Sequence, residues 1–303
     1  MRNLITLFDL TAAEIEQVLD RGVRIKADYD RGVREPLLQG RTLALLFQKP
    51  SLRTRVSFEC GMAHMGGSSL FLGKDVGWGE RESIADFAQV LGQFVDVIAC
   101  RANAHERVIE LAEHAGCPVI NALTDYSHPC QALADVLTLR ERHPGAKSLK
   151  LAYVGDANNV ARSLAICCAR LGIAFSIAAP RGYQFEQELF DRIRKDSPDA
   201  DLQQTEDPVE AVRDAAGVYT DVWISMGQEA ETEKRKQALA SYQVNGELMK
   251  HAPASACFLH CLPAHRGLEV SADVIDGPQS AVIQQAGNRM HAQKGLLAWV
   301  FGV

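Results

Sequence analysis

The chain has 303 residues, of which 47% are hydrophobic and 23% are charged, the composition of an ordinary globular protein. This length predicts two domains, because single hydrophobic cores stop growing near about 250 residues. The formal net charge of −6 argues against nucleic acid and anionic membrane surfaces as partners.

The N-terminal stretch and the cysteines indicate a cytoplasmic location. The stretch MRNLITLFDLTAAE has no long apolar core of a signal peptide, and no apolar run approaches the roughly 18 residues of a membrane span. None of the eight cysteines forms a C-x-x-C pair, which argues against zinc and thioredoxin-type sites. We therefore expect reduced thiols in a cytosolic protein.

Strand and helix patterns alternate through the first half of the chain. Short apolar runs predict strands, and longer amphipathic segments between them predict helices. The expected strands are 42–47, 68–72, 95–101 and 118–122, and the expected helices are 53–65, 83–94 and 104–115. Strands separated by helices of 10–15 residues are typical of a parallel sheet.

The stretch RHPGAKSL at 142–149 interrupts this alternation, and we interpret it as a domain boundary. A second series follows, with strands expected at 150–156, 173–180, 217–223 and 256–262, and with helices from about 159 and 185 and at 288–301. We predict an α/β fold of two doubly wound parallel-sheet domains with the active site in the cleft between them. The predicted limits are 1–143, 144–285 and a C-terminal helix, 286–303, that returns to the first domain.

A basic cluster follows the first expected strand. In FQKPSLRTRVSFE, Ser51 can cap the next helix, whose free N–H groups and positive dipole end suit a phosphate. Arg53 adds a guanidinium that can bind phosphate oxygens in bidentate fashion. Simple capping with solvated arginines is the alternative. The position at the carboxyl end of a strand favours an anion site.

The stretch DYSHPCQALADVL places His128 and Gln131 where another helix begins, with Pro129 suited to its first turn. A neutral histidine and a glutamine amide can donate to a carbonyl group and accept from an amide. A hydrogen-bonded structural histidine remains the alternative.

Four further positions in the second half carry polar or reactive groups. In GDANNVARSLA, Ala157 and Asn159 stand where a dinucleotide fingerprint needs glycine, so this helix start favours a polar small molecule. Asp221 ends an expected strand and can hold an amine or cap a helix. Cys261 ends another strand, where a buried structural cysteine is the usual alternative. Arg289 begins the last helix, where a surface arginine would be the default.

Four motifs combine in one order: S-x-R-T at 51–54, H-P-C-Q at 128–131, D-x-x-x-S-M-G at 221–227 and H-C-L-P at 260–263. With them the chain resembles the aspartate/ornithine carbamoyltransferase family along essentially its whole length. The first two motifs are shared widely in that family and imply carbamoyl phosphate as a substrate. The last two are narrower and imply ornithine.

The resemblance also implies which residues bind each substrate. For carbamoyl phosphate these are Ser51, Leu52, Arg53, Thr54, Arg101, His128, Pro129, Cys130, Gln131 and Arg289. For ornithine and the carbamoyl amide these are Asn159, Asp221, Ser225, Met226, Cys261 and Leu262. The residues expected to act in catalysis are Arg101, His128, Asp221 and Cys261. Which of Asn158 and Asn159 contacts ornithine stays open.

The implied reaction transfers the carbamoyl group to the δ-amine of L-ornithine, giving L-citrulline and phosphate in arginine metabolism. An ammonium has no lone pair, so the amine must react in its neutral form, although its pKa in water resembles the roughly 10.4 of lysine. Arg101, His128 and Thr54 would stabilise charge that develops on the carbonyl oxygen. The resemblance implies a homotrimer and no metal or organic cofactor. The biosynthetic or catabolic direction stays open.

The loop KDVGWGERES departs from the family pattern, which often has a polar side chain that reaches a neighbouring subunit's phosphate site. Here Gly77 and Trp78 occupy that place. We hypothesise that Trp78 acts on the neighbouring site by excluding water.

The sequence disfavours four alternatives to ornithine transfer. The intact S-M-G disfavours transfer to an N-acylated ornithine or to putrescine. Transfer to aspartate is disfavoured because this chain has HCLPAHRG where aspartate carbamoyltransferases usually have P-L-P-R. A non-catalytic dinucleotide-binding module is disfavoured by the missing glycines.

Overall fold

The computed structural model describes residues 2–224 and 229–303, and the chain divides into two compact units. Unit 1 is formed by the residues up to 134 together with 287–303, and unit 2 is formed by residues 135–286. The division falls within two long helices, α5 (Pro129–Arg142) and α12 (Val282–Phe301). The functional limits predicted at 143/144 and 285/286 remain predictions.

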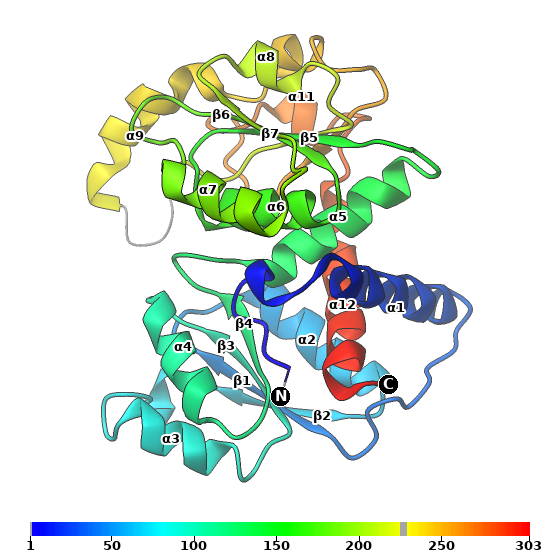
Figure 1. Cartoon of the computed structure of the whole chain (residues 1–303), viewed down its shortest axis with the longest axis vertical. Coiled ribbons are helices and arrows are strands. Elements are labelled where there is room, and N and C mark those ends of the chain that lie inside the picture. Colours follow the sequence, from blue (N-terminus) through cyan, green and yellow to red (C-terminus); the bar gives the residue numbers. More distant parts are fainter. Residues whose placement is uncertain (1, 225–228) are drawn as a thin grey trace. The chain divides into compact units, whose positions relative to one another are not determined.

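Unit 1 is built on a four-stranded parallel sheet with the strand order β2-β1-β3-β4 (Figure 1). The strands are β1 (Thr42–Phe47), β2 (Ser68–Leu72), β3 (Val97–Arg101) and β4 (Val119–Leu123). All five residues of the central strand β3 are buried, whereas the edge strand β2 is largely exposed. This difference explains why β3 reads as a continuous apolar run, as strands covered on both faces do.

Several helices of unit 1 begin at polar caps that the sequence carries. They are η1 (Leu7–Asp9), α1 (Ala12–Asp30), α2 (Leu52–His64), η2 (Lys74–Val76), α3 (Ile84–Leu91) and α4 (His105–His114). Thr11 and Glu14 form a capping box at α1, and Ser83 accepts from the Asp86 backbone N–H at α3. Among the described residues, no helix is both long and apolar enough to cross a membrane.

Unit 2 carries a five-stranded parallel sheet with the order β7-β6-β5-β8-β9 (Figure 1). Its strands are β5 (Lys150–Val154), β6 (Ala174–Ala178), β7 (Leu202–Thr205), β8 (Gly217–Tyr219) and β9 (Cys257–Leu259). Its helices are α6 (Asn159–Arg170), α7 (Gln187–Asp196), α8 (Pro208–Val212), η3 (Glu229–Glu231), α9 (Thr232–Leu239), η4 (Ala240–Tyr242), α10 (Gly246–Met249) and α11 (Ala272–Ile275).

The predicted fold class is confirmed, because both sheets are parallel and alternate with helices along the chain. Residues 287–303 also group with the first unit, as expected for the C-terminal helix. The expectation that Asp221 and Cys261 end strands is wrong by two residues. Ladder pairing between β8 and β9 stops at Tyr219 and Leu259, so both side chains lie in the loops just beyond the strands.

The hypothesis that Trp78 acts on a neighbouring subunit is wrong. Its side chain is only 4% exposed within its own chain and belongs to a hydrophobic cluster that includes residues of β1, β3 and α4. The ring lies 6.5 Å from the ring of Phe87 and 4.8 Å from the Arg107 guanidinium carbon, and Arg107 Nη2 donates to the Trp78 carbonyl at 2.9 Å. Trp78 therefore packs within its own unit.

Candidate active site

The first part of the site lies where β1 leads into α2. Ser51 is the N-cap of α2: its Oγ accepts from the Thr54 backbone N–H at 3.4 Å and donates to Thr54 Oγ1 at 3.0 Å. Leu52 is 74% exposed and Arg53 is half-buried, whereas Thr54 is buried. The first turn of a helix leaves N–H groups without intrahelical partners, so this end of α2 suits an anion.

Arg289 of α12 joins two sequence motifs that lie far apart in the chain. Its Nη2 donates to Thr54 Oγ1 of S-x-R-T at 2.7 Å, and its Nη1 donates to Gln131 Oε1 of H-P-C-Q. All three side chains are buried. The prediction that Arg289 belongs with these motifs is thus supported by direct contacts.

Two more buried residues share the electrostatic environment of Arg289. Arg101 is the last residue of β3, opposite Phe47 of β1, and His128 immediately precedes α5. Burial holds the pKa of His128 well below its ordinary value, and the positive charges of Arg289 and Arg101 lower it further. His128 is therefore neutral near pH 7. We call Thr54, Arg101, His128, Gln131 and Arg289 the cationic group.

The Pro129-Cys130 pair opens α5, as the sequence predicts. Cys130 is buried, and burial raises the pKa of its thiol to about 12, with Arg289 opposing the shift. Its Sγ donates to the Asn121 carbonyl at 3.5 Å. Cys130 is consequently a protonated thiol turned toward the protein, so a ligand contact from this residue would have to come from its backbone.

The second part of the site lies in unit 2, around Asp221. Asn158 Nδ2 donates to Asp221 Oδ2 at 2.8 Å, and Cys261 Sγ donates to Asp221 Oδ1 at 3.0 Å. Tyr153 OH donates to Asn158 Oδ1 at 3.3 Å. Asp221 is buried and Cys261 is half-buried. We call Tyr153, Asn158, Asp221 and Cys261 the carboxylate group.

The structure assigns different positions to the two neighbouring asparagines. Asn158 is the N-cap of α6 and accepts from the backbone N–H groups of Val160 and Ala161 at 2.9 and 3.0 Å. Asn159 is the first helical residue and is half-buried. The helix start predicted near residue 159 is confirmed, and which of the two asparagines contacts ornithine stays open.

A second carboxylate near the end of β5 was missed by the sequence reading. Asp156 makes an ion pair with Arg235 of α9, whose Nε also donates to the Trp223 carbonyl at 2.5 Å. Burial raises the pKa of Asp156, and Arg235 opposes this shift. The charge of Asp221 also raises the pKa of Asp156, so the two aspartates interact electrostatically, while Arg235 offsets the charge of Asp156. Ser225 and Met226 lie outside the described residues.

The loop after β9 has an uncommon backbone. The backbone of Leu262 has a φ of +56°, which residues other than glycine rarely adopt. A cis peptide bond joins Leu262 to Pro263. The Leu262 backbone N–H donates to His260 Nδ1 at 2.9 Å. This contact helps to fix the loop that carries the Cys261 thiol.

Comparison with known proteins decides the family. Residues 2–141 match the model of the aspartate/ornithine carbamoyltransferase carbamoyl-P binding domain, and residues 147–300 match that of the Asp/Orn binding domain. The chain belongs to the aspartate/ornithine carbamoyltransferase family. Ornithine carbamoyltransferase of Bacillus subtilis is 50% identical over 299 residues, which are 98% of this chain and 92% of the relative.

Solved structures of the family have the same fold. The ornithine carbamoyltransferase of Pyrococcus furiosus has a TM-score of 0.95 at 48% identity, covering 99% of this chain and 97% of that one. The anabolic ornithine carbamoyltransferase of Campylobacter jejuni has a TM-score of 0.94 at 35% identity, covering 100% and 99%. The family resemblance drawn from the four motifs is confirmed.

One set of atoms in this family member has the composition of a metal site. The ligand atoms of Asp221, His260 and Cys261 all lie within 4.8 Å of one another. Carboxylate, imidazole and thiolate are ligands that Zn²⁺ accepts. The same Asp221 and Cys261 atoms already form a hydrogen bond, and the expectation that the reaction needs no metal remains a prediction.

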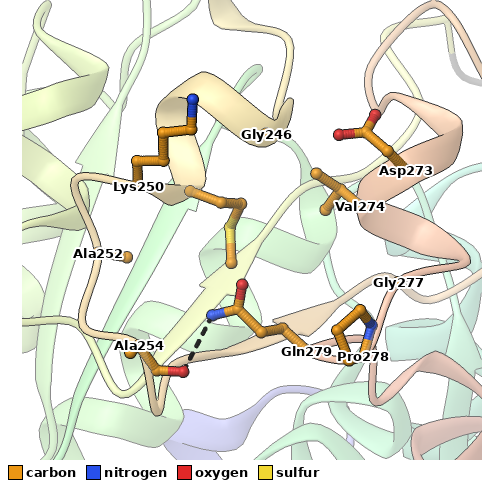
Figure 2. Close-up of a pocket in the computed structure, with 10 residues that line it drawn as sticks. Gly246, Lys250, Ala252, Ala254, Asp273, Val274, Gly277, Pro278 and Gln279 are labelled. Atoms are coloured by element: carbon orange, nitrogen blue, oxygen red, sulfur yellow. Dashed lines mark hydrogen bonds between the residues drawn. The ribbon is translucent and has the colours of Figure 1, made fainter.

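A pocket of about 420 Å³ lies elsewhere in unit 2, between α10, α11 and the segment that follows each (Figure 2). Lys250 and Asp273 contribute charged side chains to its walls, and Gln279 donates to the Ala254 carbonyl across it at 3.4 Å. Among the residues that the structure describes, none predicted for substrate binding lines this pocket.

Proposed function

We propose that this chain transfers the carbamoyl group from carbamoyl phosphate to the δ-amine of L-ornithine, giving L-citrulline and phosphate. The observation that carries the proposal is the pair of hydrogen bonds from Arg289 to Thr54 and Gln131, which unites the S-x-R-T and H-P-C-Q motifs in one buried cationic group. Relatives 47–50% identical over nearly the whole chain bear the name ornithine carbamoyltransferase, which supports this acceptor.

The cationic group suits carbamoyl phosphate. Backbone N–H groups at the start of α2, with Ser51 and Arg53, bind the phosphate oxygens. Arg101 and neutral His128 lie near the Arg289 charge and stabilise the negative charge that develops on the carbonyl oxygen. Buried donors that are already in position need no reorganisation during the reaction, so most of the rate gain is electrostatic.

The carboxylate group suits the amino-acid substrate. Asp221 pairs with the side-chain ammonium of ornithine. After that ammonium has released one proton to solvent water, the nitrogen lone pair attacks the carbamoyl carbon. The C–O bond to phosphate breaks, phosphate leaves with the electron pair, and it takes up the second proton of the amine. Cys261 and Leu262 contact the carbamoyl amide, and Asn158 or Asn159, with Ser225 and Met226, contact the α-amino-acid end of ornithine.

A comparison of acceptors tests the proposal. The protein is incubated with carbamoyl phosphate and, in separate reactions, with ornithine, putrescine, aspartate or N-acetylornithine, and each ureido product is measured. We expect product with ornithine and less than about one hundredth of that rate with the others, because unpaired polar groups penalise an incomplete substrate strongly. A higher kcat/KM with N-acetylornithine or putrescine would reject the assignment of ornithine.

Location, assembly and direction are proposals as well. All eight cysteines lie among the described residues and are free thiols, which supports a cytoplasmic location. We propose a homotrimer, in keeping with the family resemblance. The name of the Pyrococcus furiosus relative includes "anabolic", which supports the biosynthetic direction. Sedimentation velocity tests the assembly, and phosphate-dependent breakdown of citrulline tests the direction.

A further inference from the structure

A buried carboxylate, Glu269, contacts the loop that carries Cys261. Its side chain is 1% exposed. Its backbone is fixed by a hydrogen bond from the Val244 N–H to the Glu269 carbonyl at 2.9 Å, and it lies in a tight turn in which the Gly267 N–H donates to the Val270 carbonyl at 2.8 Å. Glu269 belongs to none of the four family motifs quoted above.

Two histidines of the loop meet this carboxylate. The His265 backbone N–H donates to Glu269 Oε1, and the same oxygen lies 3.4 Å from His260 Nε2. Glu269 Oε2 lies 3.7 Å from His265 Nδ1. One carboxylate therefore contacts both ends of the segment 260–265, which contains Cys261 and Leu262.

The hydrogen bonds of His260 fix which nitrogen carries its proton. Nδ1 accepts from the Leu262 N–H at 2.9 Å, so Nδ1 has no proton of its own. A neutral ring then carries its proton on Nε2, the nitrogen that faces Glu269. The His260 backbone N–H donates to Gln285 Oε1 at 2.9 Å, which holds the residue at its other end. An anionic Glu269 favours this tautomer and this ring orientation.

Glu269 has the charge that such a contact needs. Burial alone raises the pKa of a carboxyl group, but the nearby His260 ring and hydrogen bonds from the backbone N–H groups of His265 and Glu269 more than offset it, so the pKa of Glu269 lies below its ordinary value. The carboxylate is ionised at neutral pH. Apolar packing is often as stabilising as a buried ion contact, so the burial of Glu269 is weak evidence for a role in stability alone.

We propose that Glu269 is a positioning residue, which through His260 and His265 holds the 260–265 loop so that the Cys261 thiol faces Asp221. The φ of +56° at Leu262 is unfavourable for a residue with a side chain, and the hydrogen bond to His260 Nδ1 offsets part of that cost. When the contacts of Glu269 with His260 and His265 are lost, the Leu262 backbone leaves its unfavourable φ and the Cys261 thiol moves away from Asp221. The expected loss of turnover with ornithine rests on the proposed function. The expected change in the accessibility of the Cys261 thiol does not.

The primary test replaces Glu269 with glutamine, which keeps the shape and removes the charge. Alkylation of Cys261 by iodoacetamide, followed by peptide mass spectrometry, is compared with the wild type at one pH. We expect the Cys261 rate to rise at least about threefold. We also expect kcat/KM for ornithine to fall at least about tenfold, and KM for carbamoyl phosphate to stay within twofold, because small displacements of reacting groups lower rates strongly. Glu247→Gln, at an exposed glutamate of the same unit, is the matched control and should change neither quantity.

A second pair of variants decides the matter if Glu269→Gln does not fold. In His260→Asn the side-chain oxygen occupies the place of Nδ1 and can accept from the Leu262 N–H, whereas His260→Leu has no acceptor. We expect faster alkylation of Cys261 in His260→Leu than in His260→Asn. Equal alkylation rates in that pair, or a folded Glu269→Gln protein with wild-type alkylation, would overturn the proposal. If the wild-type protein does not use ornithine as a substrate, the proposed function is rejected. The alkylation rates then still test the role of Glu269, because they do not depend on turnover.

Discussion

The cationic group of unit 1 and the carboxylate group of unit 2 are built from opposite charges. The first places two buried arginines beside a neutral histidine and contains no acidic side chain. The second places Asp221 among an amide, a phenol and a thiol, with the Asp156–Arg235 ion pair nearby in sequence. In the proposed function each group binds one substrate, an anionic acyl phosphate in the first case and a cationic amino acid in the second.

In the proposed function, this difference lets a mildly acidic chain select two oppositely charged substrates. A net charge of −6 would repel carbamoyl phosphate at long range, so the anion depends on local donors at the helix start and on buried arginines. The proposed partner of the amine substrate is instead a carboxylate, Asp221, whose two oxygens accept hydrogen bonds from Asn158 and Cys261. Variants in the cationic group should therefore weaken the use of carbamoyl phosphate, and variants in the carboxylate group should weaken the use of ornithine.

Removal of Arg101 should produce the largest effect. Arg101→Met takes away a buried donor to the developing oxyanion, and we expect kcat to fall about 10²–10³-fold, or roughly 3–4 kcal/mol. Steady-state kinetics with both substrates measure this change. The exposed Arg24→Met is the control and should keep wild-type kcat. A loss below about fivefold for Arg101→Met would show that the cationic group does not stabilise the reacting carbonyl.

Neutralising Asp221 should affect the other substrate. Asp221→Asn removes the charge that pairs with the amine, and we expect kcat/KM for ornithine to fall about 10–100-fold, in line with about 1.5–3 kcal/mol for a charged hydrogen bond. KM for carbamoyl phosphate should change less than about twofold. The exposed Asp199→Asn provides the matched control. Equal losses of kcat/KM for ornithine and for carbamoyl phosphate would contradict the assignment of the two groups to different substrates.

A smaller effect is expected at Arg53, which is half-buried. Arg53→Ala should raise KM for carbamoyl phosphate about tenfold and leave KM for ornithine nearly unchanged, because a charge-assisted contact with phosphate is lost. Its neighbour Arg55 is exposed and pairs with Glu59 at 3.0 Å, so Arg55→Ala serves as the control. Similar kinetics for the two variants would remove Arg53 from the phosphate site.

The smallest expected effect concerns acid stability. The pKa of His128 is lower in the folded protein than the roughly 6.5 of the unfolded chain, so the unfolded chain binds more protons below that pH. Stability is therefore unaffected above about pH 6.5 and falls by up to about 1.4 kcal/mol per pH unit below it. Urea unfolding at pH 7.5 and 5.5 should show a smaller loss for His128→Gln than for the wild type. The exposed His114→Gln should lose as much as the wild type, and an equal loss in both variants would refute the assignment.

Much of this organisation could be predicted from the sequence, because its signals are local. The apolar runs predicted the strands of both sheets except the polar edge strand β7, which the sequence analysis missed. Ser51 and Ser83 mark helix starts that the structure contains. However, a shift of one residue in a helix boundary changes which side chain caps the helix. Asn158 rather than Asn159 caps α6, and no periodicity distinguishes two adjacent asparagines.

The remaining features depend on contacts between distant segments. Asp156 and Arg235 lie 79 residues apart, and their pairing has no local signal. Glu269 contacts its histidines through a turn whose geometry the sequence does not reveal. The burial of Trp78 was missed because an aromatic residue in a glycine-rich loop reads as exposed, whereas Arg107 and Phe87 cover it.

One binding measurement tests the division of labour between the two groups most directly. Calorimetry with a non-transferable phosphonate analogue of carbamoyl phosphate is carried out on the wild type, Arg53→Ala and Asp221→Asn, without ornithine. We predict that Asp221→Asn binds the analogue within twofold of the wild-type Kd, while Arg53→Ala binds it at least about tenfold more weakly. Equal weakening in both variants, or weakening only in Asp221→Asn, would contradict the assignment of the anionic substrate to the helix start and the cationic group.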